Sequence, residues 1–162
     1  MRTLQEWFDA YAVSHQNLAN KRIHLICVPT IFFSIVGLLQ SINANWLQQL
    51  VPFTAPIIVN WAGVVLLFAL LFYVRLSIAM AFKIALFALF CLTANYYIGL
   101  HLPLAIVSIG LFVAAWIGQF YGHKIEGKKP SFLHDLQFLL IGPAWIIHEF
   151  FEKKVSVSHK GR

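Results

Sequence analysis

The stretch PIIVNWAGVVLLFALLFYVRLSIAMAFKIALFALFCLTANYY, residues 56–97, contains only two charged side chains, Arg75 and Lys83. A helix needs roughly 20 apolar residues to cross the hydrocarbon core of a bilayer, so this stretch is long enough to cross twice. We therefore predict two membrane-spanning helices, residues 56–74 and 77–97, joined by a tight hairpin.

Two further apolar stretches, residues 24–41 and 102–121, complete a predicted set of four membrane-spanning helices. The composition agrees, because 60% of the residues are hydrophobic, only 11% are charged and the mean hydropathy is +0.76. Soluble domains carry about 25% charged residues. The 162 residues leave room for one domain, so residues 1–162 are predicted to form a single all-α integral membrane domain.

Charge is distributed unevenly over this predicted topology. All Lys, Arg, Asp and Glu residues fall at or near one membrane surface, and the connections 41–56 and 97–102 at the other surface carry none. Positively charged flanks stay on the cytoplasmic side, so both termini are predicted to be cytoplasmic. The net charge of +6 indicates attraction to anionic lipids. No nucleic-acid-binding motif accompanies it, so nucleic acid is not an expected partner.

Two shorter segments lie outside the four predicted spans. Residues 3–14 carry a capping box and apolar residues at helical spacing, which predicts a helix lying in the membrane interface. Residues 136–151 are apolar but short, and Gly142-Pro143 interrupts them. A fifth span there would carry the lysines that follow it to the outer surface. We therefore predict a re-entrant or interfacial helical hairpin.

Histidines gather on the charged side of the membrane, where five of the seven lie: His15, His24, His123, His134 and His148. Imidazoles and carboxylates at a water-accessible membrane edge suit Fe(II), Zn(II) or Mn(II), so metal binding is the leading hypothesis. His15 and His24 are nine residues apart and would point in opposite directions on one continuous helix. A bend at residues 16–20 would bring both rings to one point.

Each of these residues also has an ordinary structural explanation. His24 at the start of a span fits an interfacial polar cap, and His123 fits a surface loop over residues 121–135. Glu126 and Glu149 are equally compatible with neutralising nearby lysines. These alternatives stay open on spacing alone.

Several enzyme classes lack their signatures. The closely spaced histidine boxes of integral-membrane di-iron desaturases are absent, and so are the H-E-x-x-H and C-x-x-C patterns. There is no nucleophile elbow and no phosphate-binding glycine loop. Cys27 and Cys91 lie in apolar segments and are interpreted as small packing residues.

Three spaced motifs resemble those of the Mpo1-like family, formerly a domain of unknown function. The first is YAVSHQN at 11–17 with NKRIH at 20–24 and Val28-Pro29; the second is QFYGH at 119–123 with Glu126-Gly127 and Lys129-Pro130; the third is Gly142-Pro143 with Glu149. The motifs follow the family's order over essentially the whole chain. The spans between them match only in being apolar.

The resemblance implies an Fe(II)-dependent dioxygenase that catalyses α-oxidation of 2-hydroxy fatty acids, using O2 and removing one carbon. Matched position by position, His15, His24 and His123 would be the iron ligands. Glu126 and Glu149 also fall in motif positions, as a further carboxylate ligand or as supporting groups. His134 and His148 depart from the family pattern and lose weight as ligands.

Substrate binding follows from the same resemblance. The carboxylate of a 2-hydroxy fatty acid would be held electrostatically by Lys21, Arg22 or Lys128, and its acyl chain would lie between the spans. The family's eukaryotic members imply the endoplasmic reticulum, whereas the short loops here favour a bacterial inner membrane. The sequence leaves chain-length preference and homo-oligomerisation open.

The alternative function is a non-catalytic multi-span scaffold or a metal-binding membrane protein such as a small carrier. A carrier places polar ligands along a path through the membrane midplane. Here the spans are nearly free of charge and the histidines lie at one edge, which argues against transport.

Overall fold

The structure is a computed structural model that describes residues 3–12, 15–51, 55–127 and 141–147. This part of the chain is helical and contains no strand. Its helices are α1 (Leu4–Ala12), α2 (Leu18–Gln40), α3 (Asn45–Gln49), α4 (Trp61–Leu76), α5 (Ile78–His101) and α6 (Leu104–Glu126), and residues 141–147 are also helical. The expectation of an all-α chain is therefore confirmed for the described residues.

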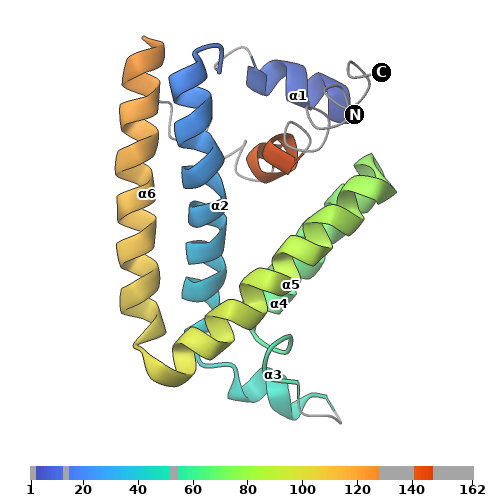
Figure 1. Ribbon diagram of the computed structural model, residues 1–162. Helices are drawn as coiled ribbons and strands as arrows, with labels where there is room; N and C mark the ends of the chain where they lie inside the picture. Colours follow the sequence, from blue (N-terminus) through green and yellow to red (C-terminus); the bar gives the residue numbers. More distant parts are fainter. Residues whose placement is uncertain (1–2, 13–14, 52–54, 128–140, 148–162) are drawn as a thin grey trace, which may run out of the picture.

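Two long helices, α2 and α6, lie side by side along much of their length (Figure 1). Glycines on α6 allow this approach: a Cβ at Gly118 would lie 2.6 Å from the Cys27 sulfur, and one at Gly122 would lie 2.4 Å from Asn20 Oδ1. Small residues spaced four apart let membrane helices pack backbone against backbone. The pair sets the spacing between the start of α2 and the end of α6.

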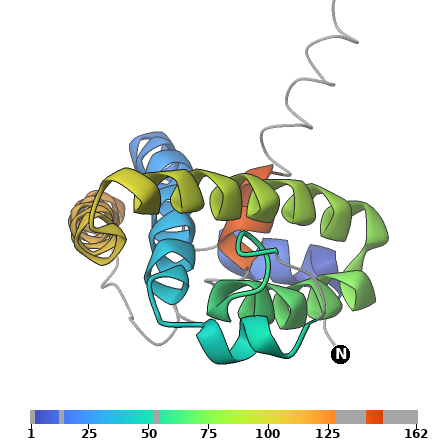
Figure 2. The ribbon, with the colours of Figure 1, turned by 90° about the horizontal axis from the view of Figure 1, so that it is seen from below.

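Helices α4 and α5 form the predicted hairpin, and Ser77 lies between them. The Ser77 side chain caps α5 by accepting a hydrogen bond from the Met80 amide, while its own amide donates to Tyr73 O. Viewed from below, α4 and the beginning of α5 lie across α2 from α6, whereas the end of α5 reaches α6 (Figure 2).

Within the described residues, three helices, α2, α5 and α6, are long and apolar enough to cross a membrane. Helix α4 is apolar but has only 16 residues, so the structure supports three of the four predicted spans by length. The predicted span 56–74 loses its first residues because Asn60 caps α4: its side chain accepts from the Gly63 amide and donates to Pro56 O and Ile57 O.

Near the start of α2, helix α1 and residues 141–147 pack against the bundle. Their buried residues form one apolar cluster with α2, α4 and α5; members include Phe8, Tyr11, Val28, Tyr73, Ile84, Ile141 and Trp145. The interfacial helix predicted at 3–14 corresponds to α1. Most of the hairpin predicted at 136–151 lies outside the described residues, and the part that is described, 141–147, is buried against these helices.

Two local expectations were wrong. Residues 97–101, expected to belong to a connection, are the last residues of α5, and the connection to α6 comes later, at Leu102 and Pro103. The loop expected from residue 121 begins only after Glu126, because Gly127 ends α6 in the left-handed conformation (φ 71°). Glycine at this position closes helices at low steric cost.

Candidate metal centre

His15 lies between α1 and α2 and is buried, with 3% of its surface exposed. Its Nδ1 is 2.8 Å from the carbonyl oxygen of Tyr11. A carbonyl oxygen can only accept, so Nδ1 carries the proton and Nε2 keeps a lone pair. That Nε2 is buried and has no hydrogen-bond partner among the described residues.

His24 lies in the second turn of α2 and repeats the arrangement. Its Nδ1 donates to the carbonyl oxygen of Asn20 at 3.0 Å, which again leaves Nε2 as the atom with the lone pair. The ring is 1% exposed. Metal-binding histidines usually donate their second N–H in this way, because the bond fixes both tautomer and ring orientation.

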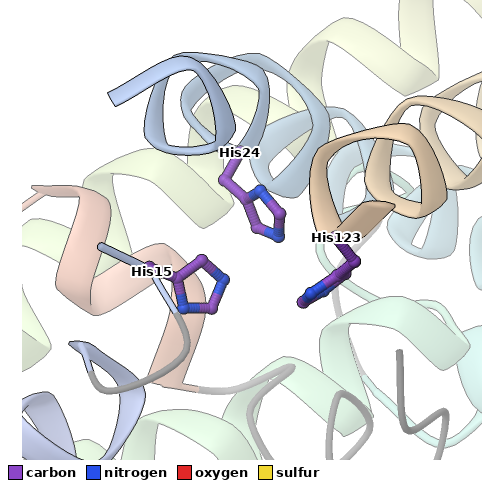
Figure 3. Close-up of side chains that lie close together, drawn as sticks. All are labelled: His15, His24 and His123. Atoms are coloured by element: carbon purple, nitrogen blue, oxygen red, sulfur yellow. The ribbon is translucent and has the colours of Figure 1, made fainter. Parts of the chain in front are cut away.

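His123, in the last turns of α6, completes the group. The ring centres are 4.4 Å apart for His15 and His24, 5.0 Å for His24 and His123, and 5.7 Å for His15 and His123. One ligand nitrogen from each ring lies within 4.8 Å of the other two. Figure 3 shows the three rings converging from α2, α6 and the segment after α1.

The predicted bend is what brings His15 to this point. Asn17 is extended and caps α2, its side chain accepting from the Ala19 and Asn20 amides. The chain therefore breaks between His15 and Leu18 instead of continuing one helix. The prediction of a bend is confirmed, although residues 18–20 already belong to α2.

Burial keeps the His15 imidazole neutral. Desolvation is the main reason that its pKa is lowered to about 4, and the nearby His123 and Lys21 act in the same direction. The hydrogen bond to Tyr11 O and the Glu126 carboxylate oppose this shift but do not cancel it. A neutral imidazole is the form that binds a metal ion.

Two aromatic rings, those of Tyr11 and Trp145, pack next to His15. The Tyr11 ring stacks on His15 with centres 4.0 Å apart and planes 10° from parallel, and Trp145 lies 5.9 Å from His15. The Lys21 ammonium is 5.8 Å from the centre of the Trp145 ring, within the range of a cation–π contact. A cation therefore stands beside the histidines.

The other candidates have different positions. Both carboxylate oxygens of Glu126 accept hydrogen bonds. The donors are the backbone amides of Gln16 and Asn17 and the side-chain amide of Asn20. Arg22 is exposed. Lys128 and Glu149 lie outside the described residues, as do His134 and His148.

Sequence reasoning missed two residues that shape the site. Asn20 is fully buried, holds His24 through its carbonyl and binds Glu126 through its amide. Gly122 lets α6 approach Asn20 and His24. The available signal was the small-residue pattern Gly118-x-x-x-Gly122, which is typical of closely packed membrane helices.

The residues present fit a transition metal ion. Three imidazole nitrogen donors suit Fe, Zn, Cu or Ni, and hard cations such as Mg²⁺ prefer oxygen. A buried Nε2 without a partner is costly unless something binds it. Among the described residues, these histidines are the group whose ligand atoms converge.

Comparison with known proteins agrees with the arrangement of motifs. Residues 1–154 match the family described as 2-hydroxy-palmitic acid dioxygenase Mpo1-like. The chain is also 30% identical over 152 residues to 2-hydroxy-palmitic acid dioxygenase MPO1 of Saccharomyces cerevisiae. The aligned region covers 93% of this chain and 80% of the yeast protein. No solved structure matches the chain significantly. Because the family match extends over nearly the entire sequence, this chain belongs to the Mpo1-like family.

Proposed function

We propose that this protein is an Fe(II)-dependent dioxygenase that converts 2-hydroxy fatty acids into fatty acids one carbon shorter. The observation that carries the proposal is the convergence of three buried imidazoles, from His15, His24 and His123, on one point. The activity named for the yeast relative supports the choice of substrate.

The reaction balances with O2 as the only oxidant. The C1–C2 bond of the 2-hydroxy acid breaks, C2 becomes the carboxyl carbon of the shorter acid, and C1 leaves as CO2. These two carbons together lose four electrons, and one O2 takes up four electrons. One molecule of water is released with the shorter acid and CO2, so the reaction requires no further reductant.

Bound Fe(II) would supply the redox-active centre for O2 chemistry, which side chains alone do not provide. The protein's own contribution is to hold three imidazoles near one point, with the tautomers of His15 and His24 fixed by Tyr11 O and Asn20 O. Three protein ligands leave coordination positions for small molecules. The rings of Tyr11 and Trp145 contact His15 and would exclude water from that side.

Lys21 is the better placed of the described cations to attract the substrate carboxylate. It lies against Trp145 beside the histidines and contributes to the electrostatics of His15. Arg22, the next residue, is exposed and would act at longer range. Lys128 and Glu149 stay in the proposal on their motif positions alone, as a head-group cation and a supporting carboxylate.

The membrane supplies the substrate. The acyl chain of a fatty acid is insoluble in water, and α2, α5 and α6 are apolar enough to lie in a bilayer. We propose that the histidine end faces the cytoplasm, because the positively charged flanks lie there. The yeast relative points to a eukaryotic membrane and does not support the expected bacterial inner membrane.

A non-catalytic scaffold is less well supported. Burying three imidazoles whose ligand atoms face one another costs free energy, and a scaffold gains nothing from that cost. A scaffold would also keep its function after these histidines are replaced.

The test is aerobic turnover of 2-hydroxypalmitate by the purified, Fe(II)-loaded protein in detergent, followed by mass spectrometry. We expect a product one carbon shorter from the wild type, and none from His15→Ala, His24→Ala or His123→Ala. Palmitate, which lacks the 2-hydroxyl, is the control substrate. Stoichiometric iron without product would overturn the substrate assignment, and a folded protein that binds no metal would overturn the enzyme.

A further inference from the structure

The Glu126 carboxylate makes long-range contacts that a metal ligand does not need. Its Oε1 accepts a hydrogen bond from the Gln16 amide at 2.7 Å. Its Oε2 accepts from the Asn17 amide at 3.0 Å and from Asn20 Nδ2 at 2.9 Å. All three donors lie more than one hundred residues earlier in the chain.

These donors belong to the segment that carries His15 into the site. The Gln16 and Asn17 amides directly follow His15 and precede the first residue of α2, so no helical carbonyl is available to them. A carboxylate at this place satisfies both amides and adds favourable charge at the N-terminus of a helix. The break in the chain at residues 15–17 is therefore tied to α6.

The same carboxylate is connected to the other two histidines. Asn20 donates to it from its side chain and holds His24 Nδ1 through its backbone carbonyl. His123 lies three residues before Glu126 in α6, on the same helix face. One side chain thus joins the segments that bear all three imidazoles.

We infer that Glu126 is a positioning residue of the metal centre and not a metal ligand. Both of its oxygens are occupied by the donors described above, and it is not among the groups whose ligand atoms converge. It holds the His15 segment against α2 and α6, so that the His15 nitrogen stays near those of His24 and His123. This inference rests on the proposed metal site.

The experiment compares wild type and Glu126→Gln, both full-length in detergent, without metal and with Co(II) or Zn(II). We expect the glutamine variant to bind metal about 10-fold or more weakly, the range seen when a partner of a metal ligand is removed. The visible spectrum of bound Co(II) should be unchanged, because the ligand set is the same. In the metal-free protein, amide exchange should rise in residues 15–20 and stay unchanged around Asn95.

Glu6→Gln is the matched control. Glu6 is also an acidic helix-terminal residue whose carboxylate accepts a backbone amide, that of Thr3, but this contact is local to α1. It should leave metal affinity and exchange at residues 15–20 unchanged. If Glu126→Gln does not fold, Glu126→Asp keeps the charge with a shorter reach and should show the same pattern at smaller amplitude.

Distinct results would overturn the inference. An altered Co(II) spectrum in Glu126→Gln would make Glu126 a ligand. Unchanged affinity and unchanged exchange would make its contacts irrelevant to the site. A lower melting temperature with wild-type affinity would reduce Glu126 to a general structural role. If the wild type itself binds no metal, the proposed function fails. The amide-exchange comparison still tests whether Glu126 holds residues 15–20 in place.

Discussion

Polar side chains are buried at both ends of the helix bundle, but they play different roles there. At the histidine end, each of His15 and His24 gives one nitrogen to a backbone carbonyl and turns the other toward a common point. At the opposite end, a second cluster, which we name the Asn95 junction, consists of Gly37, Asn95 and Ser108 from α2, α5 and α6. Asn95 there gives its amide to Phe33 O and Cys91 O.

The difference lies in what the remaining polar atoms face. Asn95 Oδ1 and Ser108 Oγ lie against Gly37 without a hydrogen-bond partner among the described residues, and the Asn95 amide links α5 to α2 by donating to Phe33 O. The nearby cavity of about 510 Å³ is lined by uncharged residues only. The remaining histidine nitrogens instead face one another at the end of the bundle that carries the charge. The Asn95 amide at one end holds helices together, and the histidines at the other end form the candidate metal centre.

The largest effect is expected from His24→Ala, compared with His101→Ala at the end of α5. Loss of His24 removes a proposed ligand, so metal affinity should fall by more than the roughly 10–100-fold caused by losing a ligand's hydrogen-bond partner. His101 is exposed and distant in the fold from the three converging rings, so its variant should bind as the wild type does. Elemental analysis after metal loading and dialysis measures both. If His24→Ala and His101→Ala lost equal metal affinity, the two ends of the bundle would not differ in metal binding.

Gly122→Ala should have the next largest effect, with Gly110→Ala as its matched control. A Cβ at Gly122 would lie 2.4 Å from Asn20 Oδ1 and 3.3 Å from the His24 ring, whereas one at Gly110 meets nothing within 4 Å. We expect metal affinity to fall about 10-fold in Gly122→Ala, since the partner of His24 must move. Gly110→Ala should be neutral or more stable by about 0.5–1 kcal/mol, as alanine favours helix. Competition titration with Zn(II) reports the affinities.

The sequence predicted the helices better than it predicted their ends. Long apolar runs located α2, α5 and α6 because membrane burial demands them. At the end of α6, Gly122 suggests a loop in the sequence but lies inside the helix, where it allows close packing against α2. The family motifs grouped His15, His24 and His123, whose ligand atoms converge in the fold, and their role as ligands stays a prediction. No local pattern contains the contacts of Glu126. Those contacts join residues more than one hundred positions apart and exist only in the fold.

Gly37→Ala should sharpen the comparison from the other end. A Cβ there would meet both Ser108 Oγ and Asn95 Oδ1 at separations far below van der Waals contact. Overpacking of this kind typically costs about 1–3 kcal/mol. We expect a lower melting temperature in detergent with wild-type metal affinity, because the histidine end is untouched. A loss of metal affinity would show that the two ends are coupled.

The smallest effect is expected from Asn95→Ala. A hydrogen bond between membrane helices contributes about 0.6 kcal/mol on average, and Asn95 makes one such bond, to Phe33 O. The variant should therefore unfold slightly more easily and bind metal normally. The Asn95→Ala variant is most informative when it is combined with Gly37→Ala. Alanine at position 95 removes one of the two atoms that the new methyl group would strike, so the double variant should lose less stability than the sum of the single losses. Additive losses in detergent unfolding would contradict the contact between Asn95 and Gly37 on which the Asn95 junction depends.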